Sequence, residues 1–272
     1  MVVQTPRRRY RTIFVSDIHL GTRGCKAEFL LDFLNHNDAE TFYLVGDIVD
    51  GWRLKKSWYW PQSHDAVVQK FLQKARRGSR VVFVPGNHDE VLRHYIGEHF
   101  GGIEVVTDCI HETADGKRML VLHGDQFDGV VRYAKWVALL GDTAYNLLLI
   151  LNRWFNVARR WCGLGYWSLS AYIKCKVKNA VQFVNQYEEA VAEEARRRKA
   201  DGVVCGHIHH AEMRQIGDVL YVNDGDWVES CTAVAEQMDG TLEILNWAEQ
   251  RNFSMLNTRV DVGNRKPADA AA

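Results

Sequence analysis

The sequence lacks three features that would assign a chain to a class at once: a net charge, a long apolar run and closely spaced cysteines. Lysine plus arginine and aspartate plus glutamate both number 34, so the formal net charge is zero. A dedicated nucleic-acid-binding protein usually carries a basic excess, so this balance argues against that class. The closest approach to a membrane span, at 147–151, is interrupted by Asn152 and Arg153, and a transmembrane helix needs roughly 18 apolar residues.

The cysteines and the N-terminal residues also exclude some classes. The six cysteines are scattered and form no C-x-x-C pair, which is typical of a reduced, cytoplasmic setting. The basic residues at 7–9 are followed by only a short apolar stretch at 13–15, so we expect no signal peptide. Hydrophobic residues make up 47% of the 272 residues and charged residues 25%, which predicts a globular protein with a full core.

Alternating strand and helix patterns predict a mixed α/β fold, termed α+β in some schemes. Apolar strands are predicted at 12–16, 41–45 and 81–84, with helices at 28–34 and 67–75 between them. One face of the first helix holds Phe29, Leu30, Phe33 and Leu34. Further strands are predicted at 104–107, 109–112, 118–122, 202–205, 219–222, 231–236 and 241–246, with a hairpin turn at Asp115-Gly116. The pattern therefore indicates two packed β-sheets flanked by helices.

Residues 127–199 have no strand pattern and predict a helical insert within a single domain at 1–262. The polar, alanine-rich residues 263–272 predict a disordered tail. The insert combines basic residues with apolar ones that include Trp136, Trp154, Trp161 and Trp167. This composition suits an interfacial surface or a groove for acyl chains, and equally an insert packed on the core with its basic residues in solvent.

Five short polar motifs each follow a predicted strand. They are Asp17-Ile18-His19, Gly46-Asp47 with Asp50, Gly86-Asn87-His88-Asp89, His123-Gly124-Asp125 and Gly206-His207-Ile208-His209. Ligands gather at the carboxyl ends of strands in α/β sheets, so five distant motifs can meet at one place. Any one of them alone would be read as a polar turn, but five in order argue against coincidence.

These motifs offer carboxylates, an amide and imidazoles as ligands, without cysteine. The candidate metal ligands are Asp17, His19, Asp47, Asn87, His123, His207 and His209. Such a mixture suits manganese, iron or zinc in an open catalytic site. Seven ligands are too many for one tetrahedral ion, but they fit two ions if one carboxylate bridges them. Two ions about 3.5–4 Å apart activate water and clamp a phosphoryl oxygen, which predicts a two-metal phosphoesterase.

The five motifs, in this order, resemble the signature of the calcineurin-like metallophosphoesterases. The resemblance implies that family's four-layer sandwich, with one metal held by Asp17, His19, Asp47 and His209. It implies a second metal held by Asp47, Asn87, His123 and His207, so that Asp47 bridges. In the same way His88 is expected to stabilise the transition state or protonate the leaving oxygen, and Asp89 to orient His88 through a hydrogen bond.

Within that superfamily the chain resembles the UDP-2,3-diacylglucosamine diphosphatases of lipid A biosynthesis. The likeness rests on the position of the insert and on Trp52, Gly225, Asp226, Trp227, Glu229 and Ser230. It implies cleavage of the lipid-linked UDP-sugar to UMP and 2,3-diacylglucosamine 1-phosphate with two Mn²⁺ ions. It also implies a cytoplasmic enzyme peripheral to the inner face of the bacterial inner membrane. That family usually has arginine where His88 stands, and a protonated His88 supplies charge without bidentate geometry.

Six residues are candidates for contact with this substrate: Asn87, His88, Asp128, Ser168, Lys174 and Lys178. Lys174 and Lys178 are four apart and share a helix face, whereas Asp128 suits either a sugar hydroxyl or a helix N-cap. Two alternatives stay open. One is a metallophosphoesterase for another nucleotide diphosphate or phosphodiester, which the tryptophan-rich insert disfavours. The other is a non-catalytic scaffold that binds a membrane or a partner, which the complete ligand set disfavours.

Overall fold

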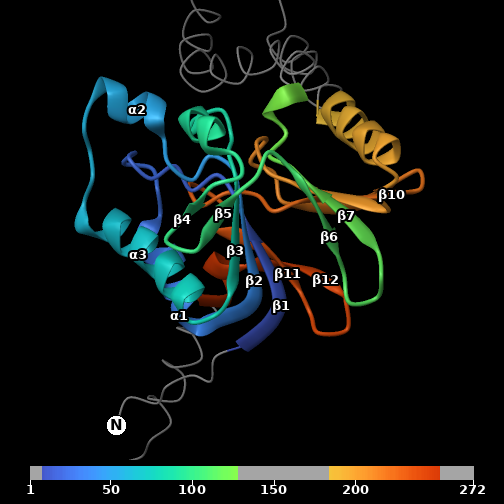
Figure 1. Ribbon diagram of the computed structural model, residues 1–272, viewed down its shortest axis with the longest axis horizontal. Helices are drawn as coiled ribbons and strands as arrows, with labels where there is room; N and C mark the ends of the chain where they lie inside the picture. Colours follow the sequence, from blue (N-terminus) through green and yellow to red (C-terminus); the bar gives the residue numbers. More distant parts are fainter. Residues whose placement is uncertain (1–7, 128–183, 252–272) are drawn as a thin grey trace, which may run out of the picture. The chain divides into compact units, whose positions relative to one another are not determined.

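Two β-sheets form the centre of the structure, a computed structural model that describes residues 8–127 and 184–251. The larger sheet has the strand order β12-β11-β1-β2-β3-β5-β4 and the smaller one β6-β7-β8-β10-β9 (Figure 1). The strands are β1 (Arg8–Val15), β2 (Asn37–Val45), β3 (Arg80–Val84), β4 (His99–Phe100), β5 (Ile103–Val105), β6 (Cys109–Glu112), β7 (Arg118–Val121), β8 (Gly202–Cys205), β9 (Glu212–Ile216), β10 (Val219–Asn223), β11 (Thr232–Glu236) and β12 (Leu242–Asn246).

The centre of each sheet is parallel, and antiparallel strands lie at its edges. In the larger sheet β1, β2, β3 and β5 run parallel, whereas β11, β12 and β4 pair antiparallel. In the smaller sheet β7, β8 and β10 run parallel between antiparallel β6 and β9. Parallel neighbours end at the same edge of a sheet, so the loops that follow β1, β2 and β3 lie together, as do those after β7 and β8.

Alternating side chains build two apolar layers on the larger sheet. On β2, Phe42 and Leu44 face a core that includes α1 and α3, whereas Tyr43 and Val45 face the other sheet. Phe14 on β1 stacks on Tyr43 with ring centroids 5.0 Å apart. The second sheet adds Val121 and other apolar residues to this inner layer. One continuous apolar layer thus packs the two sheets against each other.

Two helices, at 27–36 and 62–76, cover the outer face of the larger sheet (Figure 1). The helical elements are α1 (Ala27–His36), α2 (Gly51–Lys56), α3 (Gln62–Arg76), the 3-10 turns η1 (Glu90–Tyr95) and η2 (Asp125–Phe127), and helical residues at 184–197 and 247–251. On α1, Leu30, Phe33 and Leu34 are buried as predicted. The prediction that Phe29 shares this face is wrong, because Phe29 is 43% exposed and Ala27 takes the buried position one turn earlier.

The predicted strands and helices are confirmed in kind, and their ends differ. The hairpin at Asp115-Gly116 joins β6 to β7, with Gly116 at φ +83°. β1 and β2 begin earlier than the predicted apolar segments, because backbone pairing continues through residues 8–10 and 37–39, most of which are polar. The edge strand β9 and the short helix α2 were not predicted, because neither has a periodic apolar pattern.

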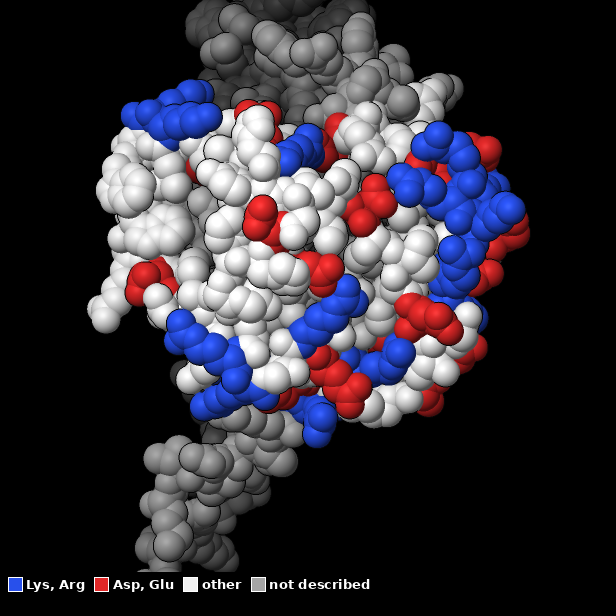
Figure 2. All heavy atoms as spheres, viewed as in Figure 1, with Lys and Arg blue, Asp and Glu red and all other residues white. Residues whose placement is uncertain are grey.

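The chain divides into two compact units, one of 1–124 with 195–272 and one of 125–194. Both sheets belong to the first unit. The predicted insert at 127–199 and tail at 263–272 stay predictions, because most of the one and all of the other lie outside the described residues. No helix among the described residues combines the length and apolar character needed to cross a bilayer. Figure 2 shows both signs of charge over the face in view, with uncharged areas between them.

Candidate metal centre

All seven candidate ligands lie in loops at the carboxyl ends of strands. Two follow β1, one follows each of β2, β3 and β7, and two follow β8: Asp17, His19, Asp47, Asn87, His123, His207 and His209. All belong to the unit that contains both sheets. The predicted convergence is therefore present: seven polar groups from five loops lie at adjoining ends of two packed sheets.

These loops hold five of the ligands in the left-handed backbone region. The φ angles of Asp17, His19, Asp47, His207 and His209 lie between +48° and +70°. Residues other than glycine rarely adopt this region, and each such residue costs about 1–3 kcal/mol. Backbone hydrogen bonds hold the conformation, among them Asp17 N to Gly46 O at 3.0 Å and His19 N to Asp47 O at 2.9 Å. Strain concentrated at these positions is typical of a functional site.

The ligand atoms form two groups around Asp47. In the first group His209 Nε2 lies 3.0 Å and His19 Nε2 3.7 Å from Asp17 Oδ1. In the second, His123 Nε2 lies 3.4 Å from Asp47 Oδ1, and His207 completes the group. The other carboxylate oxygen of Asp47, Oδ2, faces the first group at 3.8 Å from His19 Nε2. Asp47 thus presents one oxygen to each group, which is the geometry of a bridging carboxylate.

Polar contacts on the far side of two imidazoles indicate which nitrogen faces the centre. His123 Nδ1 lies 2.8 Å from the carbonyl oxygen of Val45, so Nδ1 carries the proton and Nε2 is left to face Asp47. His19 Nδ1 lies 3.4 Å from Asp50 Oδ2, with Nε2 toward the carboxylates. Metal-binding histidines are usually oriented in this way by a carbonyl or carboxylate.

Asn87 offers an amide oxygen for which the described residues supply no partner. Asn87 Oδ1 is buried and accepts no hydrogen bond from the described part of the chain. The next residue contacts the centre through its backbone, because His88 N donates a hydrogen bond to Asp47 Oδ1 at 2.8 Å. A buried oxygen without a donor is costly, and a cation satisfies it. The donor set of carboxylate, amide and imidazole fits a pair of divalent ions.

Two glycines allow the loops to approach each other this closely. A Cβ atom at Gly46 would overlap the imidazole of His123, and a Cβ at Gly86 would overlap the carboxylate of Asp47. Gly46 also has φ +81°. The glycines of these two motifs are therefore needed to bring the ligands together, in addition to starting the turns.

The carboxylates and imidazoles of this centre strongly shift each other's pKa values. Burial opposes charge on His19, but hydrogen bonds to Asp17 and Asp50 raise the pKa of His19 to about 10. Burial would raise the pKa of Asp17, but His209 and His19 hold it well below its ordinary value. Without a metal, His19 therefore keeps its proton at neutral pH, and a cation must displace it.

The carboxylate that faces His88 is Asp50, which corrects the expectation that Asp89 orients this residue. His88 Nδ1 lies 3.1 Å from Asp50 Oδ1. Asp89 instead accepts hydrogen bonds from the backbone N–H groups of Gly86 at 2.6 Å and Ile48 at 2.8 Å. Burial, with the nearby charge of Asp47, raises the pKa of Asp89 to about 6. Asp89 thus positions the β2 and β3 loops, whereas Asp50 is the partner that the sequence reasoning missed.

Two tryptophans from the family comparison flank the centre. Trp52, on α2, lies with its ring centroid 4.4 Å from that of His88 and donates a 3.2 Å hydrogen bond to Glu90. Trp227 is fully buried against Phe33, and its backbone N–H donates to Asp17 O at 3.1 Å. The first limits the freedom of His88, and the second supports the loop that carries Asp17.

Four of the predicted substrate contacts lie outside the described residues: Asp128, Ser168, Lys174 and Lys178. The other two, Asn87 and His88, lie at the metal centre, with Asn87 buried and His88 partly exposed. The structure thus brings together every predicted metal ligand and two of the six predicted substrate contacts.

Comparison with known proteins gives a family and a group of relatives. The family model described as Calcineurin-like phosphoesterase matches residues 10–211. A Photorhabdus laumondii protein named UDP-2,3-diacylglucosamine hydrolase is 27% identical over 219 residues, which cover 75% of this chain and 84% of the relative. A protein of the same name from Blochmanniella pennsylvanica is 28% identical, with coverage of 75% and 81%. The solved structure of Yfce, a phosphoesterase from E. coli, covers 86% of this chain and 98% of its own at 14% identity, with a TM-score of 0.43.

Proposed function

The chain belongs to the calcineurin-like phosphoesterase family, and from that premise we propose that it hydrolyses the diphosphate of UDP-2,3-diacylglucosamine to UMP and 2,3-diacylglucosamine 1-phosphate. The family makes it a hydrolase that uses divalent metal ions. The observation that carries the chemistry is the placement of Asp47 between two groups of ligand atoms. The observation that carries the substrate is the name of the relatives that match three quarters of the chain.

Two ions of Mn²⁺ fit the donor set proposed for this centre. Asp17, His19, Asp47 and His209 would hold one ion. Asp47, Asn87, His123 and His207 would hold the other. Oxygen and imidazole donors without sulfur favour Mn²⁺ or a similar borderline cation over a closed structural zinc site. When bound, the metal pair supplies an activated water and neutralises the phosphoryl oxygens.

The side chains of the protein would then position the diphosphate and supply the proton for the leaving oxygen. His88 lies beside Asp47 without being buried, with its Nε2 3.9 Å from Asp47 Oδ2, so it can reach a phosphoryl or leaving oxygen. Asp50 Oδ1 lies 3.1 Å from Nδ1 of His88, with Nε2 on the side of Asp47. A protonated imidazole in this place stabilises charge on the transition state or donates a proton to the leaving oxygen. None of these steps needs a covalent bond between protein and substrate.

The acyl chains of the proposed substrate also lead to a proposal for where the protein is located in the cell. A diacylated sugar is held in a bilayer by its acyl chains, so an enzyme that cleaves its headgroup works at a membrane surface. We therefore propose peripheral binding to the cytoplasmic face of the bacterial inner membrane, with the predicted insert at 127–199 as the lipid contact.

A comparison of two UDP-sugars tests the proposed substrate. Protein loaded with Mn²⁺ is given UDP-2,3-diacylglucosamine or UDP-N-acetylglucosamine, and UMP release is measured. We expect rapid release from the diacylated compound and far slower release from the other. Equal rates would show that the acyl chains are not recognised. Hydrolysis of bis(p-nitrophenyl) phosphate without UMP release from either sugar would place the chain with phosphoesterases of another substrate.

A further inference from the structure

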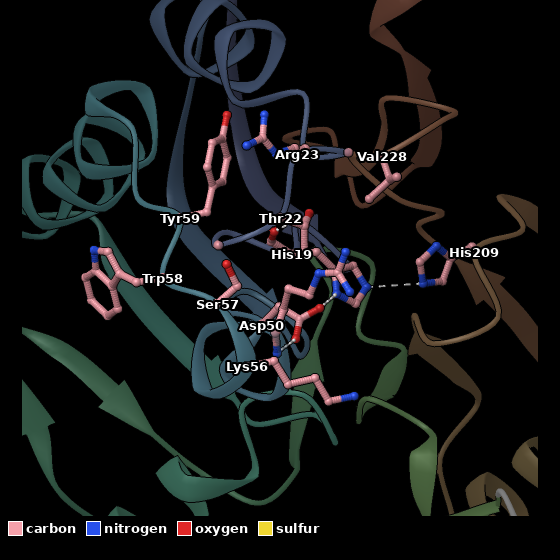
Figure 3. Close-up of a pocket in the computed structure, with 13 residues that line it drawn as sticks. His19, Thr22, Arg23, Asp50, Lys56, Ser57, Trp58, Tyr59, His209 and Val228 are labelled. Carbon is pink, nitrogen blue, oxygen red and sulfur yellow. Dashed lines mark hydrogen bonds and ion pairs between the residues drawn. The ribbon is translucent and has the colours of Figure 1, made fainter.

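A pocket of about 540 Å³ opens beside the metal centre, on the side of His19 and His209. Its walls come from the loop between β1 and α1 and from α2 with the residues after it (Figure 3). All of its lining residues belong to the unit that contains both sheets. The volume lies within the roughly 300–1,000 Å³ that small-molecule sites occupy. Of the seven candidate metal ligands, two line this pocket, His19 and His209.

The pocket carries an excess of positive charge. Arg23, Arg53 and Lys56 line it, and among residues 8–127 and 184–251 no carboxylate pairs with any of the three side chains. The one acidic residue in the lining, Asp50, is engaged by His19, by His88 and by the backbone N–H of Arg53. Three cations that no described carboxylate pairs with, beside a phosphoesterase centre, favour an anionic ligand.

Aromatic side chains form the end of the pocket away from the candidate metal ligands. Figure 3 shows His209 at one end and Trp58 and Tyr59 toward the other, with Lys56 and Ser57 between them. Trp58 is 77% exposed, the highest value among the exposed large apolar side chains of the described residues. Tyr59 carries the guanidinium of Arg23 over its ring at 5.0 Å. An exposed indole beside unpaired cations is the combination that binds a phosphorylated aromatic base.

We propose that this pocket binds the nucleotide half of the substrate, with the base stacked on Trp58 and the negative charge of the nucleotide facing Arg23, Arg53 and Lys56. The assignment rests on the proposed function, since it places one half of a UDP-sugar next to the metal centre. An acyl chain does not suit the same pocket, because it would have to be buried beside three unpaired charges. The lipid half of the substrate then leaves the metal centre in another direction.

Calorimetric binding of UMP and ribose 5-phosphate to the Mn²⁺-loaded protein tests the proposal. The two ligands share a sugar phosphate and differ in the base. We expect wild-type protein to bind UMP about tenfold more tightly, because stacking of a base on an aromatic side chain has this magnitude. Trp58→Ala should remove that preference. The double variant Arg53→Gln/Lys56→Gln should weaken the binding of both ligands by about tenfold, as expected for the loss of two solvent-exposed ion pairs.

Lys55→Gln is the matched control, because Lys55 is exposed on the same helix and does not line the pocket. It should bind UMP as the wild type does. All the replaced side chains are exposed, so each variant should fold as the wild type does. Binding is compared between proteins of equal Mn²⁺ content and equal melting temperature. The proposal is overturned if Trp58→Ala keeps the preference for UMP. It is equally overturned if the double variant binds UMP as tightly as Lys55→Gln.

The outcomes separate this proposal from the proposed function. Hydrolysis of UDP-2,3-diacylglucosamine by a protein whose UMP binding ignores Trp58, Arg53 and Lys56 overturns the pocket and leaves the substrate assignment standing. Trp58-dependent binding of UMP by a protein that releases no UMP from the diacylated compound supports the pocket and overturns the lipid substrate.

Discussion

Replacement of Asp50 by asparagine tests a role that appears only in the folded structure. One carboxylate oxygen of Asp50 lies 3.1 Å from His88 Nδ1, and the other lies 3.4 Å from His19 Nδ1. Burial would raise the pKa of Asp50, but these two imidazoles hold it well below its ordinary value. An asparagine keeps one acceptor oxygen and turns the other group into a donor, so one of the two imidazoles loses its partner.

The expected effect falls on activity and metal affinity more than on stability. Loss of a residue that hydrogen-bonds a metal ligand typically costs about 10–100-fold in metal affinity or activity. Asp50 also caps α2, with Arg53 N donating to its Oδ1 at 2.7 Å. Asparagine caps helices about as well as aspartate, so the capping contribution to the free energy of unfolding should change by less than about 0.5 kcal/mol.

The assay is hydrolysis of bis(p-nitrophenyl) phosphate over a range of Mn²⁺ concentrations, with the melting temperature measured in parallel. Asp65→Asn is the control, because Asp65 is an exposed carboxylate near the start of α3. We expect a lower kcat, a higher Mn²⁺ requirement or both for Asp50→Asn, and neither for Asp65→Asn. The reasoning is refuted if Asp50→Asn keeps wild-type kcat and Mn²⁺ requirement, or if its activity falls only in step with its melting temperature.

Three further predictions concern the metal centre and the sheet. Asn87→Ala should lower kcat/KM for bis(p-nitrophenyl) phosphate by at least about 100-fold, because it removes a metal ligand; near-normal turnover would remove Asn87 from the ligand set. Because the metal-free pKa of His19 is about 10, a cation must displace its proton, so the Mn²⁺ association constant should rise up to about tenfold per pH unit between pH 6.5 and 7.5; an affinity independent of pH, measured by calorimetry, would contradict this. Burial opposes ionisation of Glu236, but its hydrogen bond to His111 and others lower its pKa to about 2, so its contribution is present above pH 4.5 and lost as pH falls toward 2. Glu236→Gln should therefore cost about 2 kcal/mol in urea unfolding at pH 7 and clearly less at pH 3, and an equal cost at both would refute the linkage.

The metal ligands could be predicted from the sequence because their positions follow from strand ends. Each of β1, β2, β3, β7 and β8 ends in a short apolar run that stops two or three residues before its first ligand. Parallel pairing within each sheet then brings the loops together. The chemistry of the ligands needed no coordinates, since carboxylate, amide and imidazole in one place indicate a cation.

The partner of His88 could not be predicted, because it depends on a turn rather than on a pattern. Asp89 is adjacent to His88 in the sequence, but its side chain turns back to the backbone of Gly86 and Ile48. Asp50 is 38 residues away along the chain and reaches His88 because α2 begins just after it. The order of residues within a motif thus identified the motif without giving the direction of each side chain.

The basic pocket was likewise invisible in the sequence. Arg23 lies between β1 and α1, whereas Arg53, Lys56 and Trp58 lie in or just after α2, a helix too short to show periodicity. Phe29 shows the opposite failure, since its spacing placed it on the buried face of α1 and the structure exposes it. Helical spacing identifies a face only to within one residue at its edge.

Metal content of the active protein tests the central claim most directly. Protein saturated with Mn²⁺ and freed of excess metal is measured by mass spectrometry for ions per chain, alongside its rate on bis(p-nitrophenyl) phosphate. The geometry around Asp47 predicts two ions per chain at full activity, and fewer than two in Asp47→Ala with loss of turnover. Full activity with a single ion per chain would contradict the two-metal centre.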